Sequence, residues 1–137
     1  MKYLFMVVII CVFHSSNAQT INPSTDNVRW VYNSVQNLLN GEILSMAGTI
    51  TSYGDSRFVW EQNGMSTTYE FKSNSTSSTW SSANSDGQLE TSATCNGVSG
   101  IVKIERSGNS VTIELNFKQA GKLTPHLILT VNSFSKI

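Results

Sequence analysis

The chain has 137 residues, and its nine Lys and Arg balance nine Asp and Glu, so the formal net charge is zero. There is no run of basic residues, and we therefore expect no electrostatic attraction to nucleic acid or to anionic membranes. The length suits a single domain with a sizeable core.

Residues 1–18 are predicted to be a secretory signal peptide. Lys2 is followed by an apolar run over residues 3–13, which is shorter than the roughly 20 residues that span a bilayer. Ser16 and Ala18 are the small residues expected just before the cleavage site. This pattern predicts a protein that is secreted, in the periplasm or outside the cell, with no membrane span.

A lipid anchor at Cys11 is an alternative interpretation of the same segment. It is not favoured, because Ile10 stands where a lipidation motif needs a small residue. Removal of the signal peptide would leave residues 19–137 as one β-rich domain. Cys95 would then be the only cysteine, so no intramolecular disulfide is expected.

The first element of the domain is predicted to be an amphipathic helix over residues 23–40. Ser24 or Thr25 would cap its start, and Gly41 would end it. We expect this helix to pack on a sheet, rather than to bind a lipid or a partner. Its apolar stripe at helical spacing consists of Val28, Val31, Val35, Leu38 and Leu39.

Alternation of apolar and polar residues then predicts strands over residues 44–53, 57–62 and 65–72, joined by tight turns at Gly54-Asp55 and Asn63-Gly64. Counting outward from these turns places Phe58 opposite Tyr69, Trp60 opposite Thr67 and Arg57 opposite Glu70. It also places Thr51 beside Phe58, Thr49 beside Trp60, and Ile50 beside Val59 on the other face. That second apolar pair predicts that part of the sheet is covered on both sides.

Residues 89–118 are predicted to form three antiparallel strands. Asn96-Gly97 suits a hairpin turn with two positive φ angles, and Gly108-Asn109 suits a type II′ turn. The expected pairs on one face are Leu89 with Ile104, Thr91 with Val102, Ala93 with Gly100, Ile104 with Ile113, and Val102 with Leu115. On the other face Lys103 falls between Glu90 and Glu114, and Glu105 lies opposite Thr112.

Residues 73–86 are rich in Ser, Thr and Asn and are predicted to be the least ordered segment; within it, Asn74 begins a possible N-glycosylation motif. A loop over residues 119–125 and a strand over residues 126–134 complete the chain. The spacing of turns predicts a mainly β fold, an antiparallel meander of about seven to eight strands with the one N-terminal helix packed against it. A barrel and a strongly curved sheet both fit this pattern.

The sequence offers little enzymatic chemistry. Residues 19–137 contain one histidine, His126, and one cysteine, Cys95. A Cys/His nucleophile pair is not favoured, because Cys95 falls on the core face and His126 at a strand start. Neither metal-ligand spacing nor a phosphate-binding loop occurs, so we expect no metal, no cofactor and no catalytic residue. The carboxylates on the strands fall at outward positions.

An aromatic group stands out instead, and it is the predicted ligand-binding site: Phe58, Trp60, Tyr69, Phe71 and Trp80. Aromatic side chains on one strand face line cavities or stack on sugars, and they also form plain cores. The preferred hypothesis is a secreted, non-enzymatic module that binds a small apolar ligand or a glycan. The alternative is a secreted interaction protein, such as an inhibitor, adhesin or effector, that uses strand edges and a Ser/Thr-rich surface. A void lined by Phe58, Trp60, Leu89, Val102, Ile104 and Leu115 would favour the first.

Overall fold

A computed structural model describes residues 20–118 and 126–137 of the chain. In these residues nine strands form one antiparallel sheet. The strands are β1 (Asn27–Asn37), β2 (Ile43–Leu44), β3 (Gly48–Tyr53), β4 (Arg57–Gln62), β5 (Thr68–Ser78), β6 (Gly87–Cys95), β7 (Val98–Ser107), β8 (Ser110–Phe117) and β9 (His126–Lys136). No helix of the described residues is long and apolar enough to cross a membrane.

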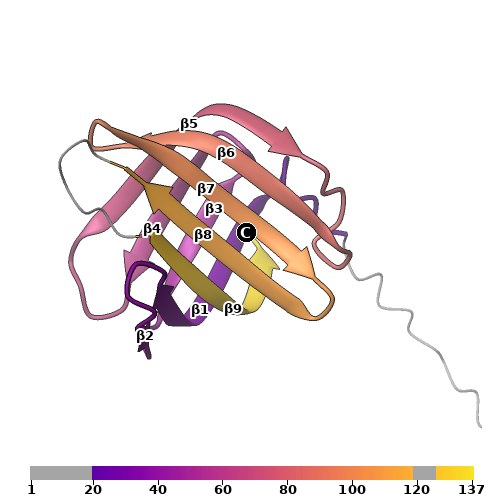
Figure 1. Cartoon of the computed structure of the whole chain (residues 1–137). Helices are drawn as coiled ribbons and strands as arrows, with labels where there is room; N and C mark the ends of the chain where they lie inside the picture. The colour runs from indigo at the N-terminus through magenta and orange to yellow at the C-terminus, as the bar shows by residue number, and fades with distance from the viewer. Residues whose placement is uncertain (1–19, 119–125) are drawn as a thin grey trace, which may run out of the picture.

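The sheet closes into a barrel because its first long strand pairs with its last. β1 hydrogen-bonds to β3 on one side and to β9 on the other, and β3 to β9 pair with their neighbours in chain order. Figure 1 shows these strands wrapped around one interior. The two-residue β2 pairs with β1 alone. The mainly β, antiparallel fold is thus confirmed, and it is an eight-stranded barrel with one short extra strand.

The predicted helix over residues 23–40 is wrong, because residues 27–37 form the strand β1. Val28, Trp30 and Tyr32 alternate into the interior, as β-branched and aromatic residues do in strands. The pairing with β9 shifts register on both sides of Tyr32, and beyond this bulge Val35 is the buried residue. A bulge adds one residue to the strand, so inward-facing positions change from even-numbered to odd-numbered residues beyond it. The spacing of apolar residues along such a strand then resembles the spacing in a helix.

The register of β6, β7 and β8 is the predicted one. Leu89 pairs with Ile104, and Ile104 pairs with Ile113. Asn96 and Gly97 have φ angles of 49° and 78°, as a two-residue turn with two positive φ angles requires. The other expected pairs of this meander are also present. These matched turns fix the inward face of three strands.

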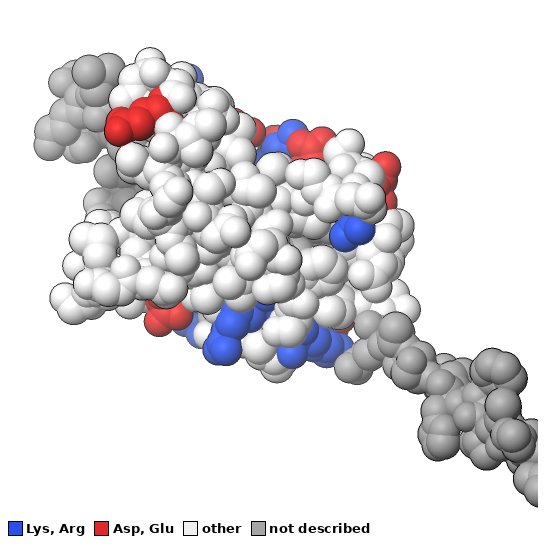
Figure 2. Space-filling model, turned by 90° about the horizontal axis from the view of Figure 1, so that it is seen from below, with Lys and Arg blue, Asp and Glu red and all other residues white. Residues whose placement is uncertain are grey.

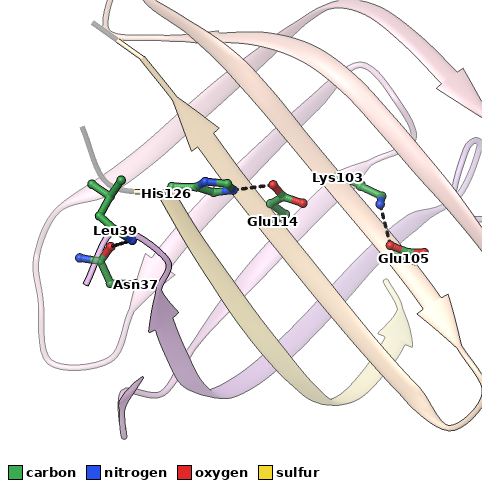
Figure 3. Close-up of polar contacts among 6 residues, drawn as sticks. All are labelled: Asn37, Leu39, Lys103, Glu105, Glu114 and His126. Atoms are coloured by element: carbon green, nitrogen blue, oxygen red, sulfur yellow. Dashed lines mark hydrogen bonds and ion pairs between the residues drawn. The ribbon is translucent and has the colours of Figure 1, made fainter. Parts of the chain in front are cut away.

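The outer face of the same meander carries a row of charges. Lys103 lies between Glu90 and Glu114 in the strand register. Its ammonium group lies 2.6 Å from the carboxylate of Glu105 on the same strand (Figure 3). The hydrogen bond to Glu105 raises the pKa of Lys103, and the neighbouring carboxylates act in the same direction. This face is therefore solvated and polar, as the alternation predicts.

The predicted pairing of β3 with β4 is wrong by one residue. Tyr53 pairs with Arg57, so the turn contains residues 54–56 rather than two residues. Ile50 consequently pairs with Trp60, and both side chains are buried in the interior. The predicted second covered face of the sheet is therefore also wrong, because a slip of one residue exchanges the two faces.

The predicted pairing of β4 with β5 is wrong by two residues. Phe58 pairs with Phe71, and Trp60 pairs with Tyr69, because the connection spans residues 63–67. A shift of two residues keeps each side chain on its face, so the predicted aromatic face survives. β5 also continues to Ser78, through residues predicted to be poorly ordered.

One end of the barrel is filled by two tryptophans. Trp80 stacks on Trp30 with ring centroids 5.6 Å apart, and its indole N–H donates to the backbone oxygen of Ser85 at 2.8 Å. Gly87 permits this approach, because a Cβ there would lie 2.5 Å from Trp80 Cδ1. The indole N–H of Trp30 donates to Ser52 Oγ at 3.0 Å. This end of the interior is therefore closed by packed and hydrogen-bonded rings.

Two of the sequence-based predictions lie outside the described residues. They are the signal peptide over residues 1–18, with its alternative at Cys11, and the loop over residues 119–125.

Candidate functional site

A cavity of about 480 Å³ lies at the end of the barrel opposite Trp80. Trp80 covers Gly87 at the start of β6, whereas the cavity is lined by Cys95 at the end of that strand. Most of its lining consists of inward-facing side chains near strand ends and the segment around β2. The apolar part of the lining is Val35, Leu44, Met46, Trp60, Tyr69, Phe71, Cys95, Val98, Leu115, Phe117 and Leu127.

One wall of the cavity is aromatic. The rings of Trp60 and Tyr69 lie 5.4 Å apart, and those of Phe71 and Phe117 lie 5.0 Å apart. The first pair meets because Trp60 and Tyr69 are register partners on β4 and β5. Both pairs are tilted, which is a favourable arrangement for aromatic rings. Contacts between neighbouring rings therefore stabilise the aromatic wall that faces the cavity.

The structure brings together three of the five predicted site residues. Trp60, Tyr69 and Phe71 line the cavity. Phe58 is completely buried and does not line it. Trp80 lies at the closed end, stacked on Trp30. The predicted aromatic group is therefore divided between the cavity wall and the core.

The interior is likewise divided between packed and hollow halves. Of the six residues predicted to line a void in a ligand-binding protein, Trp60 and Leu115 line the cavity. Phe58 and the three aliphatic residues predicted with it have no exposed surface and belong to the packed core; these are Leu89, Val102 and Ile104. The interior of an eight-stranded barrel is wide enough to be filled by side chains or to hold one small ligand.

A buried hydrogen bond holds the aromatic wall in place. The indole Nε1 of Trp60 donates to the hydroxyl oxygen of Tyr32 at 2.7 Å. Gly48 on β3 makes room for this contact, because a Cβ there would collide with the Tyr32 hydroxyl and the Glu61 backbone oxygen. Burial raises the pKa of Tyr32, and the hydrogen bond from Trp60 partly opposes that effect. The phenol is therefore neutral at physiological pH.

Polar groups occur at the mouth of the cavity. The lining includes the amides of Asn37, Gln62 and Asn96 and the carboxylate of Glu42. Asn37 Oδ1 accepts a 3.0 Å hydrogen bond from the backbone N–H of Leu39 (Figure 3), which fixes the turn after β1. Such a rim offers both hydrogen-bond donors and acceptors to a bound molecule.

Cys95 and His126 occupy different environments. Cys95 lines the cavity, and burial raises the pKa of its thiol. A nucleophilic cysteine needs the opposite shift. His126 Nε2 lies 2.5 Å from the carboxylate of Glu114 on the neighbouring strand (Figure 3). In the described part of the chain, no group of three His, Cys, Asp or Glu side chains is placed to hold a metal ion.

Several lining residues were not predicted from the sequence, among them Leu44, Met46, Phe117 and Leu127. In the sequence these residues are recognisable only as apolar residues near strand ends. That position predicts a cavity lining only once the closure of the barrel is known. No protein-family model matches the chain, and no curated protein matches its sequence.

Proposed function

We propose that this protein is a secreted, non-enzymatic module that holds a small apolar molecule in the cavity of its barrel. The observation that carries the proposal is the apolar lining of a hollow of about 480 Å³. Small-molecule sites usually have volumes of about 300–1,000 Å³ and a mainly apolar lining with a few polar groups. Secretion is proposed on the sequence of residues 1–18 alone.

The chemistry of the walls favours an apolar ligand over a glycan. Trp60, Phe71 and Leu115 offer apolar surface, and transfer of ligand surface from water contributes about 25 cal/mol per Å². Sugar hydroxyls buried against these walls would lose hydrogen bonds to water without replacement. The apolar part of the ligand therefore lies against the walls.

The polar rim predicts where the head of the ligand lies. Asn37, Gln62 and Asn96 carry amides at the mouth, and amides both donate and accept hydrogen bonds. A neutral hydroxyl or amide head group matches them without the cost of burying a charge. A long-chain alcohol is thus a suitable probe molecule, with its hydroxyl at the mouth and its chain inside.

The test is binding of the neutral fluorescent probe N-phenyl-1-naphthylamine and its displacement by 1-dodecanol. Val98→Trp fills the mouth of the cavity, whereas Ile101→Trp adds the same side chain to the outer face of β7. We expect the probe to bind saturably to the unmodified protein. Val98→Trp should raise the dissociation constant at least about tenfold, because it removes buried apolar contacts, whereas Ile101→Trp should change it by less than about twofold. Absence of saturable binding to the unmodified protein would overturn the proposal and favour the interaction-protein hypothesis. Equal effects of both substitutions would show that the probe binds elsewhere.

A further inference from the structure

The mouth of the cavity carries one charged side chain among the described residues that line it, and this is Glu42. The amides that line the mouth are neutral and both donate and accept hydrogen bonds, so they do not distinguish a cationic head group from an anionic one. Lys118 follows the lining residue Phe117, but it is exposed and does not line the cavity. Within the described lining, Glu42 is therefore the group that distinguishes ligands by their charge.

The turn between β1 and β2 holds Glu42 at the mouth. The backbone N–H of Asn37 donates to the backbone oxygen of Glu42 at 2.8 Å, and the N–H of Gly41 donates to the backbone oxygen of Asn37 at 2.8 Å. Asn40 Oδ1 accepts from the N–H of Glu42 at 3.0 Å, and Asn40 Nδ2 donates to Glu42 Oε2 at 3.3 Å. The carboxylate is therefore positioned by the fold before a ligand binds, which reduces the ordering cost of binding.

The carboxylate of Glu42 is available to a ligand. Over residues 20–118 and 126–137, it forms no ion pair with a Lys, Arg or His side chain, and only Oε2 accepts a hydrogen bond. Figure 2 views the molecule from the side on which β2 lies in Figure 1, and charged side chains there lie mainly near the edges. Glu42 is exposed, so an ammonium group beside it keeps its contact with water and avoids the cost of a buried charge. An anionic head group in the same place would meet a charge of its own sign.

We propose that Glu42 makes the cavity selective for amphiphiles with a cationic amine head group over those with an anionic head group. The apolar chain of such a ligand lies against the aromatic wall, and its ammonium group lies beside Glu42 at the mouth. An alcohol gains hydrogen bonds from the amides but no attraction between charges, so it ranks between the amine and the fatty acid. This inference rests on the proposed function, because it concerns the ligand of the same cavity.

The test compares dodecylamine, 1-dodecanol and dodecanoate as competitors of N-phenyl-1-naphthylamine at neutral pH, each below the concentration at which it forms micelles. The three competitors share one chain length and differ in the charge of the head group. Glu42→Gln removes the charge and keeps the size of the side chain and an oxygen that accepts from Asn40. Glu61→Gln is the matched control, because Glu61 is exposed next to the lining residue Gln62 but does not line the cavity.

The amine should bind the unmodified protein and Glu61→Gln at least about fivefold more tightly than dodecanoate at about 0.05 M salt. A single exposed ion pair changes an affinity by up to about fivefold, and attraction of one head group adds to repulsion of the other. Salt at about 0.5 M should reduce the ratio, because exposed charges are screened. In Glu42→Gln the two affinities should agree within about twofold.

Binding of the neutral naphthylamine probe separates the two proposals. The probe carries no charge, so all three proteins should bind it equally, which also shows that the cavity of Glu42→Gln is intact. Probe binding together with equal affinities for the amine and dodecanoate, or with tighter binding of dodecanoate, would overturn the selectivity alone. A preference for the amine that Glu42→Gln leaves unchanged would overturn the role of Glu42. Absence of probe binding to the unmodified protein would overturn the proposed function, and the selectivity with it.

Discussion

The indole Nε1 of Trp60 donates a 2.7 Å hydrogen bond to the hydroxyl oxygen of Tyr32, and both residues are buried. The two side chains come from β4 and β1, which are not adjacent, because β3 lies between them. Gly48 on β3 leaves the space through which they meet. This hydrogen bond therefore connects β1 and β4 across β3 and sets the position of one wall of the cavity.

Replacement of Tyr32 by phenylalanine should destabilise the barrel. The change leaves the indole N–H of Trp60 buried without its acceptor, which costs about 1–3 kcal/mol in the free energy of unfolding. Chemical denaturation measures the loss. Tyr53→Phe is the control, because Tyr53 is only half-buried and packs its ring under Arg57. An equal loss in both variants would mean that the Trp60 contact is not important for stability.

The same hydroxyl should make the protein sensitive to alkali. Burial raises the pKa of Tyr32 in the folded state above its ordinary value of about 10. A group with a raised folded pKa contributes stability that is complete below the unfolded pKa and is lost as pH rises through the folded pKa. Between about pH 9 and about pH 11, unmodified protein should lose more unfolding free energy than Tyr32→Phe. Parallel losses across this range in urea titrations would contradict the assignment.

The two faces of β7 should respond differently to truncation. Ile104→Ala empties a completely buried site and should cost about 2–5 kcal/mol. Glu105→Ala removes a partly exposed ion pair with Lys103 and should cost about 0–1 kcal/mol. Denaturant midpoints of the two variants provide the comparison. Losses of similar size would place Ile104 outside the core.

Cys95 should report occupancy of the cavity. Burial raises the pKa of its thiol, so alkylation by iodoacetamide should be slow at neutral pH and should accelerate as pH rises. Dodecanol bound in the cavity should slow the reaction severalfold, since Cys95 lines the cavity. Free cysteine in the same mixture controls for effects on the reagent. An unchanged rate at saturating dodecanol would place the ligand elsewhere.

Much of the fold could be predicted where the turns are unambiguous. Asn96-Gly97 and Gly108-Asn109 form two-residue turns, so counting outward gives the observed pairs of β6, β7 and β8. The turn after Tyr53 contains one more residue than expected, and the register of β3 with β4 is wrong for that reason. The predicted helix over residues 23–40 is wrong because of a bulge at Tyr32. The bulge changes which residues of β1 face inward, so the alternation typical of a strand is interrupted.

The site could be predicted only in part, because a strand face is not yet a cavity. Alternation places Trp60, Tyr69 and Phe71 on one face, and these three line the hollow. Alternation does not indicate the depth at which a residue lies in the barrel, so it does not distinguish the buried Phe58 from these three. Trp80 is close to these residues in sequence, but it stacks on Trp30 at the opposite end of the barrel. Depth depends on strand tilt and barrel closure.

The most direct test of the cavity uses a long-chain alcohol that carries bromine on its chain, because bromine quenches an indole only at close contact. The chain has three tryptophans, of which Trp60 lines the cavity, whereas Trp30 and Trp80 are stacked at the closed end. We expect saturable quenching that Trp60→Phe abolishes and Trp80→Phe retains. Quenching that persists in Trp60→Phe, or no quenching at any concentration of the alcohol, would contradict binding in this cavity.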